Sequence, residues 1–367
     1  MKRFFYCIAI ITGLLFSCSE KKQGDLLEIP VDIDQNISLP LSEISEEITA
    51  IELELTDESL INPDMNIRVI IFENNIFVAE SNKILVFDKD GKFVRSIGSR
   101  GQGPGEYNFI MSMALDEKNE RLFVVSSGPG KILCYDFNGK ILKEFSTNSI
   151  LGYVIDINYV NDELFVIDNK IGGNDEAGNF SSTILYRFSD DFHVIDSCTI
   201  QKNFDKFIFS FFKADFILKK GKSLSLYCSE LYLKKYAPRE IVLRDTLYRL
   251  EKNLLVPDLK LKFNNDGISG GNKFIDPTNI YRSSRYVFSI YDNYTKENRY
   301  CFCYDTKTGK GYNMQDGYTD DINNVDKPVK IRPFNLDTDM FYYLHTNMNP
   351  DDLEEPNPTL YIGKLKK

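Results

Sequence analysis

A glycine-rich segment is the first part of this sequence whose residue types could do chemistry. Residues 98–107 read GSRGQGPGEY. A loop that cradles a phosphate group follows a strand and opens a helix. Here the residues after Tyr107 are apolar and lead into a further strand. The segment therefore predicts a loop that crosses between strands, with glycines at positive φ, and argues against a nucleotide site.

Three side chains that border this loop are candidates for ligand binding. Arg100, Glu106 and Tyr107 supply a cation, a carboxylate and an aromatic ring within eight residues. On a ring-shaped scaffold they could line one mouth of a central channel. The competing interpretation is a local ion pair beside a packed tyrosine, which is the commoner role of such groups. The sequence leaves both interpretations open and favours the second.

Histidine chemistry has little support in this chain. A catalytic zinc site or a Ser-His-Asp triad needs correctly oriented histidines, and the sequence contains only His193 and His345. His193 lies beside a predicted turn, and His345 lies within a predicted strand. We therefore assign no catalytic residue, and the sequence leans away from an enzyme.

A group of carboxylates keeps one catalytic alternative open. Asp316, Asp320, Asp321 and Asp326 lie within eleven residues and could coordinate calcium together with carbonyl groups. Their spacing matches no EF-hand loop, so a solvated acidic loop is the favoured interpretation. We expect no resident cofactor. The alternative function is a calcium-dependent hydrolase or lyase with its site in the central channel.

Charge and cysteine usage exclude further classes. The net charge of −10 repels phosphate backbones, so nucleic acid is not expected as a partner. Five cysteines follow residue 18, an odd and scattered set that forms no disulfide framework. Cys301 and Cys303 alternate with aromatic residues, which predicts two small buried side chains on one face of a strand.

The N-terminus has the pattern of an export signal. Lys2 and Arg3 precede an apolar stretch, 4–16, which is too short to span a bilayer as a helix. Residues 15–18 read LFSC and resemble a lipobox, which predicts lipidation at Cys18; ordinary cleavage nearby is the alternative. We expect a signal peptide over 1–17, a polar tether over 18–35 and one domain over 36–367. This places the protein in the cell envelope, lipid-anchored at the outer membrane.

The remaining residues form a regular series of short strands. Apolar runs at 66–72, 76–80, 83–87 and 93–97 are separated by turn-forming residues, which predicts four antiparallel strands in a meander. The segment FDKDGK at 87–92 is answered by YDFNGK at 135–140, which is 48 residues later. Such a period is typical of the blades of a β-propeller.

Six copies of the third strand of a blade can be traced along the chain. They end near Phe87, Tyr135, Phe188, Leu250, Tyr304 and Tyr361. Their intervals range from 48 to 62 residues, which we attribute to loop insertions such as 170–182 and 264–279. The N-terminal run 48–55 has no blade of its own and can pair with the last repeat, 329–364. The sequence therefore predicts an all-β, six-bladed β-propeller closed by its N- and C-terminal segments.

Three stretches resemble the six-bladed, NHL-like propeller lipoproteins of Bacteroidota. They are ISLPLSEISEEITAIELEL at 37–55, the glycine-rich segment at 98–107, and DTLYRLEKNLLVPDLKLKF at 245–263. The resemblance extends over most of the mature chain and implies the same fold and location. It implies no mechanism, because that family is largely uncharacterised. The sequence also departs from the NHL pattern, since VVSS at 124–127 lacks the aspartate expected at the end of the second strand.

These observations favour a membrane-anchored extracytoplasmic binding or interaction module. Beyond the membrane, the expected partners are a glycan, a peptide or an envelope protein. A structural role in a larger envelope assembly is a third hypothesis.

Overall fold

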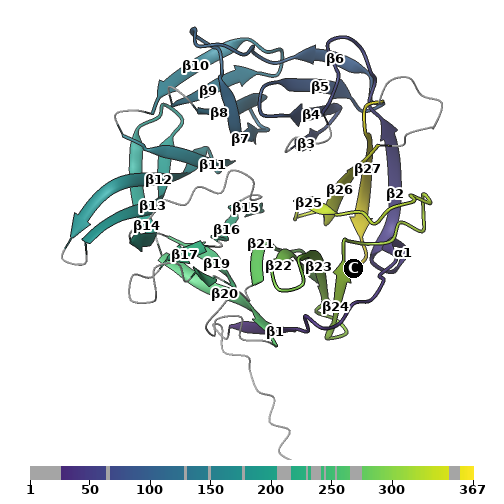
Figure 1. Cartoon of the computed structure of the whole chain (residues 1–367). Helices are drawn as coiled ribbons and strands as arrows, with labels where there is room; N and C mark the ends of the chain where they lie inside the picture. Colours follow the sequence, from purple (N-terminus) through teal and green to yellow (C-terminus); the bar gives the residue numbers. More distant parts are fainter. Residues whose placement is uncertain are drawn as a thin grey trace, which may run out of the picture.

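The protein is a ring of six β-sheet blades around a central axis (Figure 1). This computed structural model describes residues 26–62, 67–127, 130–147, 150–175, 178–204, 216–228, 230–232, 241–243, 245–252, 254–264, 275–346 and 356–367. In every blade the strand nearest the axis is followed outward by three strands in antiparallel order. The predicted six-bladed propeller is confirmed.

The first half of the ring follows the chain without interruption. Blade 1 contains β3 (Arg68–Phe72), β4 (Asn75–Ala79), β5 (Ile84–Asp88) and β6 (Phe93–Ser96). Blade 2 contains β7 (Phe109–Asp116), β8 (Arg121–Ser127), β9 (Lys131–Asp136) and β10 (Ile141–Ser146). Blade 3 contains β11 (Tyr153–Val160), β12 (Glu163–Asp175), β13 (Gly178–Ser189) and β14 (Val194–Phe204).

The second half of the ring recruits strands from the N-terminus. Blade 4 contains β15 (Ile217–Lys220), β16 (Ser223–Leu226), β19 (Thr246–Glu251) and β20 (Leu254–Phe263), with β1 (Leu27–Val31) as a fifth strand. Blade 5 contains β21 (Ile275–Arg282), β22 (Tyr286–Asn293), β23 (Asn298–Asp305) and β24 (Lys310–Gln315). Blade 6 contains β25 (Arg332–Asn335), β26 (Met340–His345), β27 (Thr359–Leu365) and β2 (Ser45–Glu52).

All six predicted third strands are confirmed, as β5, β9, β13, β19, β23 and β27. The predicted closure is also confirmed, because β2 pairs antiparallel with β27 from Ser45 opposite Leu365 to Glu52 opposite Thr359. The only α-helix among the described residues is α1 (Leu41–Ile44), which leads into β2.

The uneven spacing of the blades has a different cause from the one we predicted. Residues 170–175 and 178–182 are not a loop but extend the β12–β13 hairpin, with Lys170 opposite Ser182. The longest interval, in blade 4, contains a second hairpin made of β17 (Glu230–Tyr232) and β18 (Ile241–Leu243). Of the predicted insertion at 264–279, residues 275–279 belong to β21, and 265–274 lie outside the described residues.

The two faces of the ring differ in their connections. One face carries the turn between the first and second strands and the turn between the third and fourth strands of each blade; we call it the turn face. The opposite face, from which the chain enters each innermost strand, we call the loop face. The repeated motif lies on the turn face: Asp88 Oδ1 accepts N–H bonds from Asp90 and Lys92, and Asp136 makes the same contacts. These contacts explain why the hairpin signal repeats.

The core lies between neighbouring blades and is rich in aromatic rings. Tyr291 stacks on Tyr300 in blade 5, and Tyr343 stacks on Tyr361 in blade 6. Cys303 is fully buried and Cys301 is 1% exposed, as predicted. Burial raises the pKa of Cys301 to about 12, so its thiol stays protonated.

An N-terminal belt runs along the rim of blades 4, 5 and 6. β1 pairs in parallel with the fourth strand of blade 4, β20, and Ile37 then donates to the Asn313 carbonyl on β24. β2 completes blade 6. β1 lies inside the segment predicted as a polar tether, 18–35. It forms because Ile29 and Val31 alternate with polar residues and are buried against blade 4.

Candidate functional site

A cavity of about 230 Å³ lies on the axis of the ring. Its walls come from the innermost strands of five blades, β3, β7, β11, β15 and β25. The walls begin at Arg68 and Arg332, the first residues of β3 and β25, and reach Glu117 and Asp337 at the turn face. The cavity is therefore the central channel of the propeller.

A buried hydrogen-bond network closes one side of this channel near the loop face. Arg68 donates from one nitrogen to Ser112 Oγ at 2.9 Å and to Asp156 Oδ1 at 3.2 Å. Ser112 in turn donates to Asp156 Oδ1 at 2.6 Å. The other oxygen of Asp156 accepts the backbone N–H groups of Phe216 and Ile217 at 2.9 Å. One carboxylate, 1% exposed, thus joins the innermost strands of blades 1 to 4.

A second arginine occupies the other side of the channel. Arg332 donates to the Ile67 carbonyl at 3.0 Å and to the Tyr342 hydroxyl at 3.2 Å. The same hydroxyl accepts the N–H of Val69 at 3.3 Å. These contacts tie blade 6 to blade 1. They also fix a second guanidinium in the wall of the same cavity as Arg68.

The middle of the channel is mostly aliphatic. Val69, Leu115, Ile157 and Leu218 contribute to its walls, and at the turn face Lys219 lies 3.6 Å from the Glu117 carboxylate. These aliphatic side chains are largely buried in the blades, so polar atoms form the larger part of the cavity surface. Because Arg68 is already paired with Asp156, Arg332 is the guanidinium in the wall that favours a ligand with a carboxylate or another planar anion.

Sequence reasoning did not find Arg68, Asp156 and Arg332. They lie 88 or more residues apart in the chain and meet only because six innermost strands converge on one axis. One signal was available: Arg68 and Arg332 are charged residues that begin short apolar strands.

The predicted site residues lie elsewhere, on the loop between blades 1 and 2. Tyr107 is 1% exposed and donates its hydroxyl to the Ile97 carbonyl at 3.0 Å, and burial raises its pKa to about 12. Glu106 accepts the N–H of Gly103 at 2.8 Å, and exposed Arg100 forms a β-bridge with Tyr107. The structure brings the three together on one loop but not into the central cavity. Ligand binding by this loop stays a prediction.

Blades 1 to 3 share a polar contact at the end of their second strands. Glu80, Ser126 and Asp168 occupy equivalent positions there. Each accepts a backbone N–H from the segment that enters its own blade, donated by Asn62, Asn108 and Gly152. Ser126 therefore makes this contact in the blade whose sequence lacks the expected aspartate.

Asp168 differs from its two counterparts in being a fully buried carboxyl. Its Oδ1 has no hydrogen-bond partner among the described residues, and burial raises its pKa to about 6.

The acidic residues considered for calcium take part in contacts of the fold. Buried Asp320 accepts the N–H groups of Ile322 and Asn323 and the hydroxyl of Tyr343, and Asp321 binds Ser42. In the described part of the chain, no three His, Cys, Asp or Glu side chains lie close enough to hold a metal ion. The calcium-dependent alternative stays a prediction.

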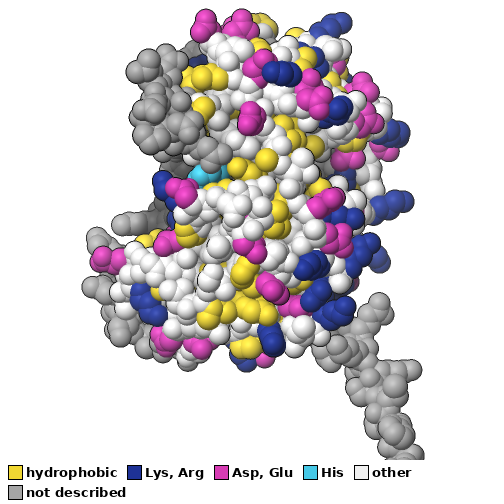
Figure 2. All heavy atoms as spheres, turned by 90° about the vertical axis from the view of Figure 1, so that its right-hand side faces the viewer, with side chains coloured by type: hydrophobic (Ala, Val, Ile, Leu, Met, Phe, Trp, Pro, Cys, Tyr) yellow, Lys and Arg dark blue, Asp and Glu magenta, His cyan; other side chains and the backbone are white. Residues whose placement is uncertain are grey.

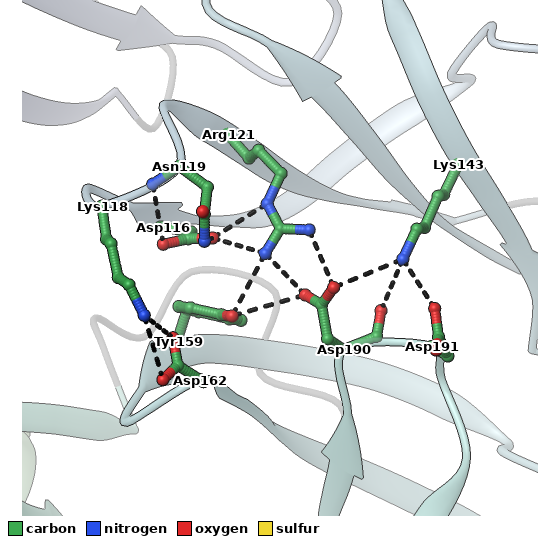
Figure 3. Close-up of polar contacts among 9 residues, drawn as sticks. All are labelled: Asp116, Lys118, Asn119, Arg121, Lys143, Tyr159, Asp162, Asp190 and Asp191. Carbon is green, nitrogen blue, oxygen red and sulfur yellow. Dashed lines mark hydrogen bonds and ion pairs between the residues drawn. The ribbon is translucent and has the colours of Figure 1, made fainter.

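An ion network joins blades 2 and 3 on the turn face (Figure 3). Arg121 donates to Asp116 of its own blade. Its Nη1 and Nη2 also donate to the two carboxylate oxygens of Asp190 in the next blade. Hydrogen bonding to Arg121 lowers the pKa of Asp190, and Lys143 adds a further contact. Because every charge here has a partner, we assign the network to blade packing and not to ligand binding.

The predicted lipidation site, Cys18, lies outside the described residues. None of the helical structure in the described ranges is long or apolar enough to cross a bilayer.

Comparisons with known proteins agree with this architecture. A family model described as "Domain of unknown function (DUF4934)" matches residues 26–367. A Bacteroides fragilis protein provisionally named as exported is 18% identical, with a TM-score of 0.62 over 94% of this chain and 100% of that chain. A Bacteroides thetaiotaomicron protein of unknown function is 8% identical, with a TM-score of 0.43 over 90% and 75% of the two chains. No curated protein matches the sequence. At 18% identity the similarity to the Bacteroides fragilis protein shows the fold alone.

Proposed function

Since the chain belongs to the DUF4934 family, we propose that it is an extracytoplasmic binding module, lipidated at Cys18, whose central cavity binds a small anionic ligand. The observation that carries the proposal is the guanidinium of Arg332 in the wall of this cavity, which the Arg68–Asp156 pair also lines.

The size of the cavity limits the ligand. Sites for drug-sized molecules measure about 300–1,000 Å³, and this cavity measures about 230 Å³. A metabolite with few heavy atoms fits this volume, whereas a folded partner or a long glycan would have to bind the outer loops. Aliphatic side chains of the wall can contact the carbon skeleton of such a metabolite, and the Arg332 guanidinium can bind its anionic group.

The location is supported by two observations. The N-terminal 17 residues have the pattern of an export signal and precede a cysteine. The Bacteroides fragilis protein that shares the fold is also named as exported. An anchored ring would hold its cavity close to the membrane surface on the extracytoplasmic side.

A ligand screen on two matched variants tests the binding site. Thermal shift and titration calorimetry with small mono- and dicarboxylates and sugar acids would be run on the wild type, Arg332→Gln and Arg299→Gln. Arg299 is a half-exposed arginine of blade 5 that binds Asp292 and lies outside the cavity. We expect the Arg332 variant to lose about tenfold in affinity and the Arg299 variant to bind as the wild type does.

Two outcomes would overturn the cavity as the site. One is the absence of any anionic ligand for the wild type across the screen, and the other is equal affinity of the wild type and Arg332→Gln. Arg332→Lys keeps the charge and separates loss of a cation from loss of folding. The anchor is tested independently, because Cys18→Ser should move the protein from the membrane fraction to the soluble fraction.

A further inference from the structure

We propose that the turn face of blades 4 and 5 docks onto an anionic lipid surface. This inference rests on the proposed lipid anchor, and it names the part of the ring that meets the bilayer. It follows from the charge of the turns, the position of β1 and the length of the tether.

Charge is divided unevenly around the turn face. In blades 4 and 5 the turns, counted from the last residue of one strand to the first of the next, carry seven cations and two carboxylates, a net charge of +5. The cations are Lys220, Lys222, Lys252, Arg282, Arg285, Lys307 and Lys310, and the carboxylates are Glu251 and Asp305. The same turns of blades 1 to 3 carry a net charge of −6. A basic sector therefore lies on a chain whose overall charge is −10.

Five of these cations form no ion pair with the part of the chain that the structure describes. Arg282 binds Asp258, and Arg285 binds Asp305. The five lysines of the sector are at least partly exposed and form no ion pair with a carboxylate of the described chain. The turn face of blade 6 carries equal numbers of carboxylates and lysines. Its first turn contains Asp337 and Asp339, and Lys366 and Lys367 follow β27. Figure 2, which looks onto the rim from the side of blade 6, shows Lys and Arg side chains projecting mainly along one edge of the ring.

The position of β1 brings this sector towards the membrane. β1 is the outermost strand of blade 4, with Leu27 opposite Leu259 of β20. β20 runs from the turn face to the loop face, and β1 is parallel to it, so the chain approaches Leu27 from the side of the turn face. Eight residues lie between Cys18 and Leu27, so the chain between them spans at most about 30 Å. A lipid on Cys18 therefore holds blade 4 nearest to the bilayer.

The positive charge of this sector indicates that its partner is an anionic lipid surface. Anionic headgroups attract lysine and arginine within a Debye length, which is about 8–10 Å at physiological salt. The acidic turns of blades 1 to 3 are repelled by the same surface. The ring should therefore tilt towards blades 4 and 5 when it is tethered.

Vesicle binding of the unlipidated protein tests the proposal. The mature chain with Cys18→Ser would be sedimented with vesicles of phosphatidylethanolamine alone or mixed with phosphatidylglycerol. The test variant replaces Lys220, Lys222, Lys252 and Lys307 by Gln. The control replaces Lys89, Lys92, Lys118 and Lys140 by Gln, which removes the same charge from exposed turns of blades 1 and 2.

We expect salt-sensitive binding that requires phosphatidylglycerol, a loss of about tenfold or more in the test variant, and a change within about twofold in the control. Equal losses in both variants, equal binding to neutral vesicles, or an unaffected test variant would overturn the proposal. Because Cys18 carries no lipid here and the cavity is assayed separately, failure of the anchor or of ligand binding would leave the vesicle result interpretable.

Discussion

Arg121 and Asp190 form a two-point contact across the boundary between blades 2 and 3, with nitrogen–oxygen distances of 3.0 and 2.6 Å (Figure 3). The same guanidinium also binds Asp116, which is 2% exposed, and lies over the ring of Phe123. Removing Arg121 would therefore leave a buried carboxylate without its cation.

We predict that Arg121→Met lowers the free energy of unfolding by about 3 kcal/mol. Urea denaturation followed by circular dichroism measures this change. Lys118→Met is the matched control, because the Lys118–Asp162 pair is exposed on both sides and should contribute less than about 1 kcal/mol. Equal effects of the two substitutions would mean that the network does not hold the blades together.

Asp168 should make stability depend on pH. Its pKa is raised to about 6, above its value in the unfolded chain, so protonation favours the folded state. That contribution is complete below about pH 4 and is lost as the pH rises through 6. Asp168→Asn should remove the dependence, and its stability relative to the wild type should improve by up to about 3 kcal/mol between pH 4 and pH 8.

Denaturant titrations at several pH values measure this difference. Asp162→Asn, which alters an exposed carboxylate in the turn just before the same strand, is the matched control. A stability difference between Asp168→Asn and the wild type that does not change with pH would show that Asp168 does not titrate in this range.

Two glycines occupy equivalent turns of blades 1 and 2. Their Ala variants distinguish the energetic cost of backbone strain from the cost of a steric clash. Gly91 and Gly139 have φ values of +83° and +86°. A Cβ on Gly91 would lie 2.1 Å from the Glu52 carbonyl oxygen of β2, whereas the nearest atom to a Cβ on Gly139 is 3.4 Å away. Both Ala variants carry a strain of about 1 kcal/mol, and Gly91→Ala should cost at least about 1 kcal/mol more. Melting temperatures in parallel samples measure the difference, and equal values would contradict the contact at ring closure.

The N-terminal belt should stabilise blade 4. Ile29 of β1 is fully buried, so Ile29→Ala should cost about 3 kcal/mol and speed hydrogen exchange in β20, at Leu259–Phe263. Glu28→Ala alters the exposed neighbour and should leave exchange in β20 unchanged. Slow exchange in β20 of the Ile29 variant would show that blade 4 does not need the fifth strand.

The fold was predictable because each blade is specified locally. The hairpin turns at Asp88 and Asp136 depend on side chain to backbone contacts within four residues, and these recur in the sequence. Ring closure followed from an N-terminal run, 48–55, that has no blade of its own and from a last repeat at the other end of the chain. β1 was missed because it contains Pro30 and pairs with a strand about 230 residues away, which no local pattern indicates.

The candidate site was not predictable in the same way. Arg68 and Asp156 come from blades 1 and 3, and only the curvature of the ring brings them within 3.2 Å. Sequence patterns specify which residues face inward from a strand, but they do not specify which inward residues of different blades share a depth along the axis. The loop at Arg100 was a candidate because four glycines lie close together within 98–105, although its tyrosine serves packing.

The pairing of β2 with β27 also fixes an order of events. Ser45 binds the carbonyl of Lys364, 319 residues further along the chain. A chain is synthesised from its N-terminus, so β2 emerges long before its partner strand. The ring can close only once that last strand is present. A chain that ends before Thr359 would keep an open sheet edge.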